Sequence, residues 1–358
     1  MVSDYDRLMT VLFAKADTSK SPLSGSFELT SRCTLDCKMC YIHRRENDKS
    51  AISGERNTAF WIDLARKAKD AGTLLLLLTG GEPMVRSDFD EIYLECKKLG
   101  LLVSVNTNAT LIDEQKLHLF TEYPPLRLNI TLYGTSRETY ANLCGNADAY
   151  DRVVNAIHEL KKLGVNMKLN FSITPYNSAD ATKAQELAKE LELPIQSTSY
   201  MFSPVRACGE TVRLSAKDAA KAHFEWKKRQ SAESDFKSLL QKSLPDESCD
   251  IMCGEKINCR AGLSSFWVTW QGEMTPCGMM TAPSAPAEDF SEAWKTISAE
   301  REKIYLPKKC AECRIRNLCD LCAAVSVAET GKSDAVPQYA CEKAHEYARL
   351  CREYVNSG

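Results

Sequence analysis

The sequence lacks three features that would each assign it to a different class of protein. It has no excess charge, because 46 lysines and arginines balance 48 acidic residues and leave a net charge of −2, which disfavours a nucleic-acid partner. Its longest apolar run, Leu74 to Leu78, falls far short of the ~18 residues of a membrane-spanning helix. Asp4, Asp6 and Arg7 lie where a signal peptide is apolar. We therefore expect a cytoplasmic protein without membrane or nucleic-acid partners.

Alternating β-rich runs and amphipathic helical patterns between residues 26 and 200 indicate βα units and a parallel sheet. The strand-like runs are Phe27–Thr30, Thr73–Thr79, Leu101–Asn106, Leu126–Leu132, Val165–Ile173 and Pro194–Tyr200, and the helical patterns are Thr58–Ala71, Ser87–Leu99, Asp113–Phe120, Ala149–Leu163 and Ala179–Leu191. Six units over about 175 residues fall short of the ~250 of a complete eight-stranded barrel. The predicted fold is therefore α/β, a partial (β/α)6 TIM-type barrel with its ligand site at the strand C-termini.

The chain is expected to divide into four parts. Residues 1–25 form an N-terminal lead-in with a short helix at Ser3–Lys15, and residues 26–215 form the partial barrel. Residues 216–249 are charged and helical in pattern and bridge to a C-terminal domain at 250–358. Nine of the sixteen cysteines follow Cys249, so this last domain is expected to take its stability from metal ligation.

Cysteine is unusually frequent, with 16 in 358 residues, but remains below the ~8–10% of small disulfide scaffolds. In a chain without an export signal the thiols should stay reduced. Cysteines at short, regular spacings are then better explained as ligands for zinc or iron–sulfur clusters than as disulfides.

Three cysteines, Cys33, Cys37 and Cys40, fall within eight residues directly after the first predicted strand. A structural zinc site is closed by four ligands, whereas three thiolates on a four-iron cluster leave one iron open to an exogenous ligand. The three-cysteine pattern therefore indicates chemistry at an open iron. The alternative is a zinc site completed by His43.

A second motif, Gly80-Gly81-Glu82-Pro83, ends the second predicted strand. Paired glycines allow a ligand to approach the backbone closely, and Glu82 offers a carboxylate to an ammonium group at the strand C-terminus. The same four residues by themselves are more often an ordinary turn. Their position one βα unit after the cysteine loop favours the functional interpretation.

The CxxxCxxC loop followed by GGEP resembles the radical S-adenosylmethionine (radical SAM) superfamily. The resemblance implies a [4Fe–4S] cluster on Cys33, Cys37 and Cys40 whose open iron binds SAM, and whose reduction yields a 5′-deoxyadenosyl radical that abstracts a substrate hydrogen. It also implies that Gly80, Gly81 and Glu82 contact the SAM amino group, that Thr131 and Arg152 hold its carboxylate, and that Met39, with Tyr41 nearby, contacts the adenine through the backbone. An ordinary strand threonine and a solvated helix arginine are the alternatives for Thr131 and Arg152.

Eight further cysteines form a C-terminal array, which alone would fit zinc or iron–sulfur equally well. With a radical SAM core upstream, the array resembles the SPASM extension of peptide and protein maturases, which carries two auxiliary [4Fe–4S] clusters. The resemblance implies auxiliary cluster I on Cys253, Cys259, Cys277 and Cys322, and auxiliary cluster II on Cys310, Cys313, Cys319 and Cys341. Two residues separate Cys319 from Cys322 where the family usually has three. The remaining cysteines, Cys96, Cys144, Cys208, Cys249 and Cys351, are interpreted as ordinary thiols.

The resemblance implies a radical SAM enzyme that modifies a peptide or protein, with an electron donor such as flavodoxin or ferredoxin. Anaerobic sulfatase maturases carry an aspartate base after the cysteine that corresponds to Cys277, whereas this chain has Gly278, so the general acid or base is unknown. Only about 25 residues precede the first strand, which suggests that a leader peptide binds elsewhere or to a separate leader-binding protein. We expect a crosslink, such as a thioether, in a ribosomally made peptide. The alternatives are a radical SAM dehydrogenase or epimerase acting on a small metabolite or peptide, and a non-catalytic iron–sulfur or zinc scaffold or electron carrier.

Overall fold

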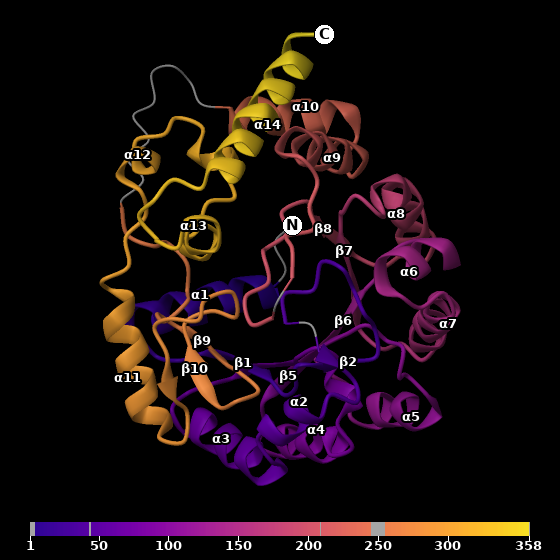
Figure 1. Ribbon diagram of the computed structural model, residues 1–358, viewed down its shortest axis with the longest axis vertical. Coiled ribbons are helices and arrows are strands. Elements are labelled where there is room, and N and C mark those ends of the chain that lie inside the picture. The colour runs from indigo at the N-terminus through magenta and orange to yellow at the C-terminus, as the bar shows by residue number, and fades with distance from the viewer. Residues whose placement is uncertain (1–3, 43, 208, 245–254, 358) are drawn as a thin grey trace.

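The structure, a computed structural model, describes residues 4–42, 44–207, 209–244 and 255–357. One sheet organises the described chain, in the strand order β11, β10, β9, β1, β4, β5, β6, β7, β8. The six strands of the barrel pair in parallel. They are β1 (Ser24–Glu28), β4 (Leu75–Thr79), β5 (Leu102–Thr107), β6 (Arg127–Thr131), β7 (Met167–Ser172) and β8 (Ile195–Thr198). Figure 1 shows the sheet as a curved wall that is open on one side.

Helices cover the convex side of this wall (Figure 1). They are α3 (Thr58–Asp70), α4 (Phe89–Lys98), α5 (Glu114–Glu122), α6 (Arg137–Cys144), α7 (Ala149–Lys162) and α8 (Ala181–Glu190). Helix α3 illustrates why they form. The Asn57 side chain accepts a hydrogen bond from the Phe60 amide at its start, and a stripe of Trp61, Leu64 and neighbouring alanines is buried, as expected of an amphipathic helix on a sheet.

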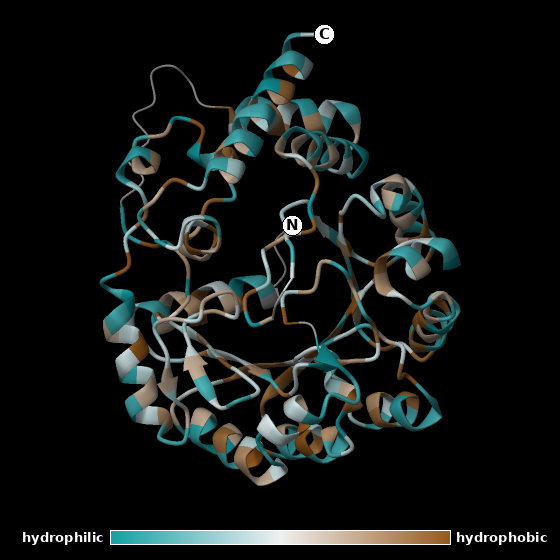
Figure 2. Ribbon diagram, in the orientation of Figure 1, coloured by the Kyte–Doolittle hydropathy of each residue, from teal (hydrophilic) through white to brown (hydrophobic). Residues whose placement is uncertain are grey.

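The alternation of side chains along each strand separates the core from the barrel interior. In β5 the side chains of Val103 and Val105 are buried, while those between them are half-buried. The outward side chains pack under the helices, for example Phe27 of β1 against Trp61 of α3 with ring centroids 5.3 Å apart. Figure 2 shows hydrophobic residues concentrated along the strands, while the outer helices carry both kinds of residue. The inward side chains remain available for a site inside the barrel.

The C-terminal part extends the barrel sheet. Strand β9 (Ser265–Val268) pairs in parallel with β1, and β10 (Glu273–Thr275) and β11 (Ala285–Pro286) continue the sheet in antiparallel pairing. Helices α9 (Ala216–Arg229), α10 (Glu233–Ser243) and α14 (Gln338–Asn356) pack together, and α11 (Phe290–Arg301), α12 (Lys308–Ala311) and α13 (Ala323–Thr330) complete this part. In Figure 1, α12, α13 and α14 face the open side of the wall. No helix within the described ranges combines the length and apolarity needed to cross a bilayer.

The six predicted barrel strands and their parallel pairing are confirmed, whereas the helical predictions need three corrections. The pattern does not predict α2 (Lys49–Gly54), a short helix whose N-cap is the Asp48 side chain. The pattern also does not predict α6, a short helix whose N-cap is the Ser136 side chain and which ends at Gly145, in the left-handed region at φ 70°. The helix predicted at Ser3–Lys15 is longer than expected, because α1 (Asp4–Ser19) continues four residues beyond Lys15. The four domain limits stay a prediction.

Candidate functional site

A cavity of about 600 Å³ lies at the C-terminal ends of the barrel strands. Polar residues from five successive strands line it: Thr79 of β4, Asn106 and Thr107 of β5, Thr131 of β6, Ser172 of β7 and Thr198 of β8. The remaining wall comes from the first cysteine loop, the loop after β4, the segment after β8 and the C-terminal array. The cavity therefore lies where the barrel pattern predicted a ligand site.

The first cysteine loop contributes all three of its thiols to this cavity: Cys33, Cys37 and Cys40. Cys33 ends the short strand β2 (Arg32–Cys33), and its sulfur accepts hydrogen bonds from the Leu35 amide at 3.5 Å and from the Asn108 side chain at 3.3 Å. The Cys40 amide donates to the Cys37 carbonyl at 3.0 Å, which closes a tight turn. The three cysteine side chains, which are separated by three and by two residues in the sequence, thus face the same cavity.

Helix α6 anchors this loop. The amides of Asp36 and Lys38 donate to the carbonyls of Cys144 and Leu143 at 2.9 and 3.0 Å. A hydrogen bond with the Cys144 thiol and burial raise the pKa of Cys37 well above its usual value. The sequence analysis left Cys144 without a role, since nothing local signals a contact across a hundred residues.

The two glycines after β4 allow a close backbone contact. The Gly81 amide donates to the Thr30 carbonyl at 2.8 Å. An added Cβ would lie 2.4 Å from the Thr30 oxygen at Gly80 and 2.3 Å from the Arg32 oxygen at Gly81. Both glycines also line the cavity. The adjacent backbone at Thr30 and Arg32 therefore leaves no room for a side chain at either glycine. The contact of the two glycines with SAM stays a prediction.

Glu82 is fully buried and does not line the cavity. Its carboxylate accepts hydrogen bonds from the Thr107 hydroxyl at 2.9 Å, the Asn108 amide at 2.7 Å and the Met84 amide at 3.3 Å. Burial raises its pKa to about 7 although these hydrogen bonds act in the opposite direction. Glu82 thus ties the loop after β4 to the end of β5, the strand end whose Asn108 contacts Cys33.

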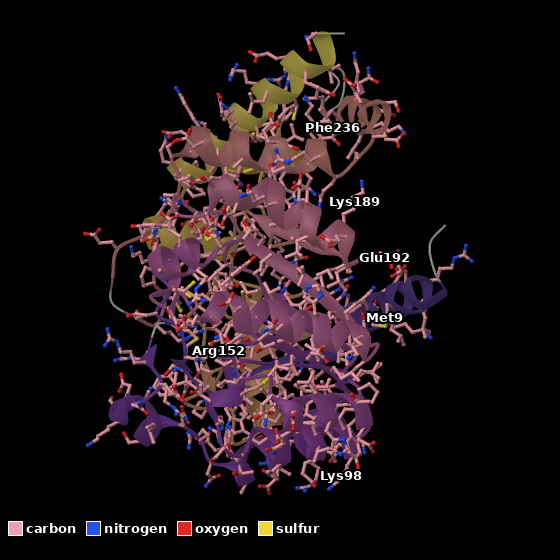
Figure 3. All side chains as sticks on the ribbon, turned by 90° about the vertical axis from the view of Figure 1, so that its right-hand side faces the viewer. Met9, Lys98, Arg152, Lys189, Glu192 and Phe236 are labelled. Atoms are coloured by element: carbon pink, nitrogen blue, oxygen red, sulfur yellow. The ribbon has the colours of Figure 1, made fainter. Side chains whose placement is uncertain are left out.

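The other three residues implied for SAM binding separate into two groups. Met39 and Thr131 line the cavity. Arg152 is exposed on α7 and is not among the cavity residues, as its labelled position on the helical face in Figure 3 shows. The structure therefore brings Met39 and Thr131 together and leaves Arg152 apart.

Asn106 is a cavity residue that the sequence analysis missed. The Asn129 side-chain amide donates to the Asn106 side-chain oxygen at 2.9 Å, and Arg127 donates to the Asn129 oxygen at 3.1 Å. Asn106 therefore adds an amide side chain, held by Asn129, to the cavity wall. The strand alternation of Leu102–Thr107, which puts this position on the inner face at the strand end, was the available signal.

The four thiols implied for auxiliary cluster II line a second, apolar cavity, bordered by Ile315, Leu321 and Pro337: Cys310, Cys313, Cys319 and Cys341. The buried Arg316 guanidinium holds this loop, since it donates to the Leu321 carbonyl at 3.0 Å. Burial raises the pKa of Cys319 to about 11. Four thiols at one cavity are the donor set that a [4Fe–4S] cluster requires.

The thiols implied for auxiliary cluster I lie on separate segments. Cys253 lies outside the described residues, as do His43, Cys208 and Cys249. Burial raises the pKa of Cys277, and the nearby Cys322 and Cys259 add to the effect. Cys322 begins α13, where its sulfur accepts a hydrogen bond from the Val325 amide at 3.4 Å, and it also lines the main cavity.

Every cysteine in the described ranges is a free thiol. Within the same ranges, no three His, Cys, Asp or Glu side chains surround a point where one metal ion would fit.

Three comparisons with known proteins agree with this geometry. Residues 27–188 match the model of the radical SAM superfamily. The AdoMet-dependent heme synthase of Methanosarcina barkeri is 25% identical over 333 residues, which cover 87% of this chain and 94% of that protein.

Two solved structures share the fold along nearly the whole chain. Streptococcus suis SuiB bound to its precursor peptide SuiA has a TM-score of 0.69 at 18% identity, covering 95% of this chain and 81% of SuiB. Native anSMEcpe with bound AdoMet and the Cp18Cys peptide has a TM-score of 0.67 at 18% identity, covering 94% of this chain and 99% of that one. Residues 27–188 therefore form a radical SAM domain, and the chain has the fold of SuiB and anSMEcpe.

Proposed function

We propose that the chain abstracts a substrate hydrogen with a 5′-deoxyadenosyl radical and forms a crosslink, such as a thioether, in a ribosomally made peptide. The observation that carries this proposal is the composition of the main cavity. Its wall contains the three thiols of the first cysteine loop and also Cys322 of the C-terminal array. A substrate in this cavity would lie within reach of both the SAM site and an auxiliary cluster.

The cofactors of this proposal are SAM and three [4Fe–4S] clusters. The convergence of Cys33, Cys37 and Cys40 on one cavity supports the first cluster, whose open iron would bind SAM. The backbone of Gly80 and Gly81, with Met39 and Thr131, would contact SAM from the same wall. Glu82 lies behind this wall and connects the loop after β4 to the end of β5 by hydrogen bonds.

Two auxiliary clusters complete the set. The apolar cavity around Cys310, Cys313, Cys319 and Cys341 supports cluster II. The electrostatic proximity of Cys259, Cys277 and Cys322 supports cluster I, with Cys253 as its fourth ligand.

Crosslinking requires a two-electron oxidation of the substrate. One hydrogen leaves as an atom to the 5′-deoxyadenosyl radical, and a second leaves as a proton when a thiol or other side chain captures the carbon radical. An auxiliary cluster held by Cys277 and Cys322 would accept the surplus electron, and a donor such as flavodoxin or ferredoxin would supply the electron that starts each turnover. The position of Cys322 in the cavity wall is what makes this acceptor accessible.

The lining favours an uncharged or cationic peptide segment as substrate. An apolar collar is formed by Tyr200, Met201, Phe202, Met279 and Val325. The lining residues that the structure describes include no lysine or arginine and one carboxylate, Asp320. A polyanionic substrate would meet no compensating charge there.

Gly278 disfavours formylglycine formation. Glycine has no side chain to remove a proton. An added Cβ at this position would lie 2.8 Å from the Trp267 ring, so an aspartate does not fit the present arrangement.

A second candidate is a reaction on a tetrapyrrole, which the likeness to AdoMet-dependent heme synthase along 94% of that protein favours. Porphyrin precursors of heme carry several carboxylates, and the described lining offers them no cation. We therefore place this reaction second.

The test is to incubate the reconstituted enzyme anaerobically with SAM, a reductant and a candidate precursor peptide, such as one encoded beside the gene. The expected product is lighter by two hydrogens and shows a new crosslink in tandem mass spectra. Unchanged mass with one solvent deuterium would indicate epimerisation, and loss of two hydrogens without a crosslink would indicate dehydrogenation. Turnover of an iron porphyrin with loss of carbon dioxide would support the second candidate.

Two cysteine variants serve as controls in this assay. Cys33→Ala should abolish 5′-deoxyadenosine formation, because it removes a cluster ligand. Cys96→Ala changes a buried thiol of α4 that lies outside both cavities and should leave both products unchanged. No peptide product with any candidate, together with porphyrin turnover, would reject the crosslinking proposal.

A further inference from the structure

Arg206 lies in the segment that connects β8 to α9, and its backbone contacts the first cysteine loop. The amides of Val205 and Arg206 both donate to the carbonyl of Tyr41, at 2.9 and 3.1 Å. Tyr41 directly follows Cys40, so this segment is attached to the end of the loop that holds the first three thiols. Both Tyr41 and Cys40 line the main cavity.

The side chain of Arg206 extends from there to the C-terminal array. Its Nη1 donates to the Gly278 carbonyl at 2.8 Å, and Gly278 directly follows Cys277. Its Nη2 donates to the Glu28 carboxylate at 2.5 Å, at the end of β1. One guanidinium therefore joins a barrel strand and the loop of a predicted auxiliary-cluster ligand, while its own backbone holds the first cysteine loop.

Trp267 of β9 completes this arrangement. Its indole N–H donates to the same Glu28 oxygen at 3.1 Å, and its ring lies over Gly278, where an added Cβ would be 2.8 Å away. Glu28 is fully buried and the Arg206 side chain is 11% exposed. A charge pair this well buried is costly to break, because either partner alone would be an uncompensated charge.

The charge of Arg206 also acts on the ligand beside it. The Arg206 guanidinium donates to the carbonyl of Gly278, the residue directly after Cys277, which places a positive charge beside the Cys277 loop. The Arg206 Nε–H is buried and has no hydrogen-bond partner among the described residues, so it remains available as a donor. A positive charge and hydrogen bonds near a cluster favour its reduced, more negative form and raise its reduction potential.

We propose that Arg206 is a positioning residue that holds the Cys277 loop against the SAM-cluster loop and raises the reduction potential of the auxiliary cluster on Cys277. The proposal rests on the proposed function, since it needs that cluster to exist. Its consequence for the reaction is that the cluster accepts the electron released when the crosslink forms. Loss of Arg206 should therefore impair the oxidation of the substrate radical and leave its formation intact.

The test is an EPR-monitored redox titration of the reconstituted holoenzyme and its variants. The signal of the SAM cluster is identified because added SAM perturbs it, and the signal of the Cys277 cluster is identified by its loss in Cys277→Ala. Arg206→Gln should shift the Cys277 cluster to a more negative potential, leave the SAM cluster unchanged and lower the amount of product per 5′-deoxyadenosine. Arg206→Lys keeps the charge and should keep the wild-type potential.

Arg213→Gln is the matched control. Arg213 lies in the same connecting segment but pairs with Glu329 at 3.3 Å and stacks on Tyr339, so its loss should leave both potentials unchanged. An Arg206→Gln potential equal to wild type would overturn the proposal. If the Arg206→Gln variant loses iron, its potential cannot be compared, and Arg206→Lys is titrated in its place. A shifted potential of the Cys277 cluster in Arg206→Lys would then overturn the proposal. Cys277→Ala with full iron content would refute the auxiliary cluster and hence the proposed function.

Discussion

The substitution Glu82→Gln tests how the loop after β4 is held. Both carboxylate oxygens of Glu82 accept hydrogen bonds from Thr107, and each also accepts one backbone N–H, from Asn108 or Met84. The fully buried carboxylate has its pKa raised to about 7, chiefly by burial. Glutamine keeps the shape of the side chain but does not ionise, so it removes the pH dependence of this group.

The sign and size of the effect follow from this shift. A raised pKa means that folding favours the protonated acid, so the stability it contributes is present at low pH and is lost as the pH rises through about 7. The shift from the usual 4.5 to about 7, at 1.36 kcal/mol per unit, corresponds to roughly 3 kcal/mol. Between pH 5 and pH 8 the wild type should lose about 2 to 3 kcal/mol relative to Glu82→Gln.

Urea unfolding followed by tryptophan fluorescence measures this difference under anaerobic conditions and at matched cluster content. The free energy of unfolding of Glu82→Gln is subtracted from that of the wild type at pH 5, 6, 7 and 8, and the four differences are compared. The fixed cost of placing an amide N–H₂ against a backbone donor cancels in this comparison. Glu91→Gln, at an exposed position of the adjacent helix α4, should give a flat difference. Parallel pH curves for the wild type and Glu82→Gln would refute the assignment of Glu82 as a buried acid with a raised pKa.

Three further predictions concern packing, SAM and metal. Gly278→Ala places a methyl group 2.8 Å from the Trp267 ring and should lower the free energy of unfolding by about 1–3 kcal/mol, and an unchanged denaturation midpoint would contradict this. Thr131→Val should weaken SAM binding roughly fivefold in equilibrium dialysis, because a hydrogen bond contributes about 1 kcal/mol, whereas Arg152→Gln should bind SAM as the wild type does; the opposite order would assign the SAM carboxylate to Arg152. The reconstituted chain should hold about twelve irons, and alanine at all three cysteines of the first loop should remove about a third of them, whereas stoichiometric zinc would contradict the cluster assignment.

Local sequence signals predicted the barrel strands and the first cysteine loop, because these depend on neighbouring residues. Alternation with period two identifies strands such as Leu102–Thr107, and the glycines that end helices have left-handed φ values, for example 104° at Gly72. Cys33, Cys37 and Cys40 face one cavity because all three lie within eight residues of a single loop.

The tertiary structure alone decided which distant residues meet. Cys144 contacts the first cysteine loop, and Arg206 contacts Glu28 across 178 positions and Gly278 across 72. Strand β9 joins the sheet beside β1 although more than 230 residues separate them. Such contacts follow from how strands pair and how side chains fill the space between them, and no local pattern encodes the partner. The sequence could therefore predict which thiols bind clusters, while only the fold showed which distant residues hold the cysteine loops in place.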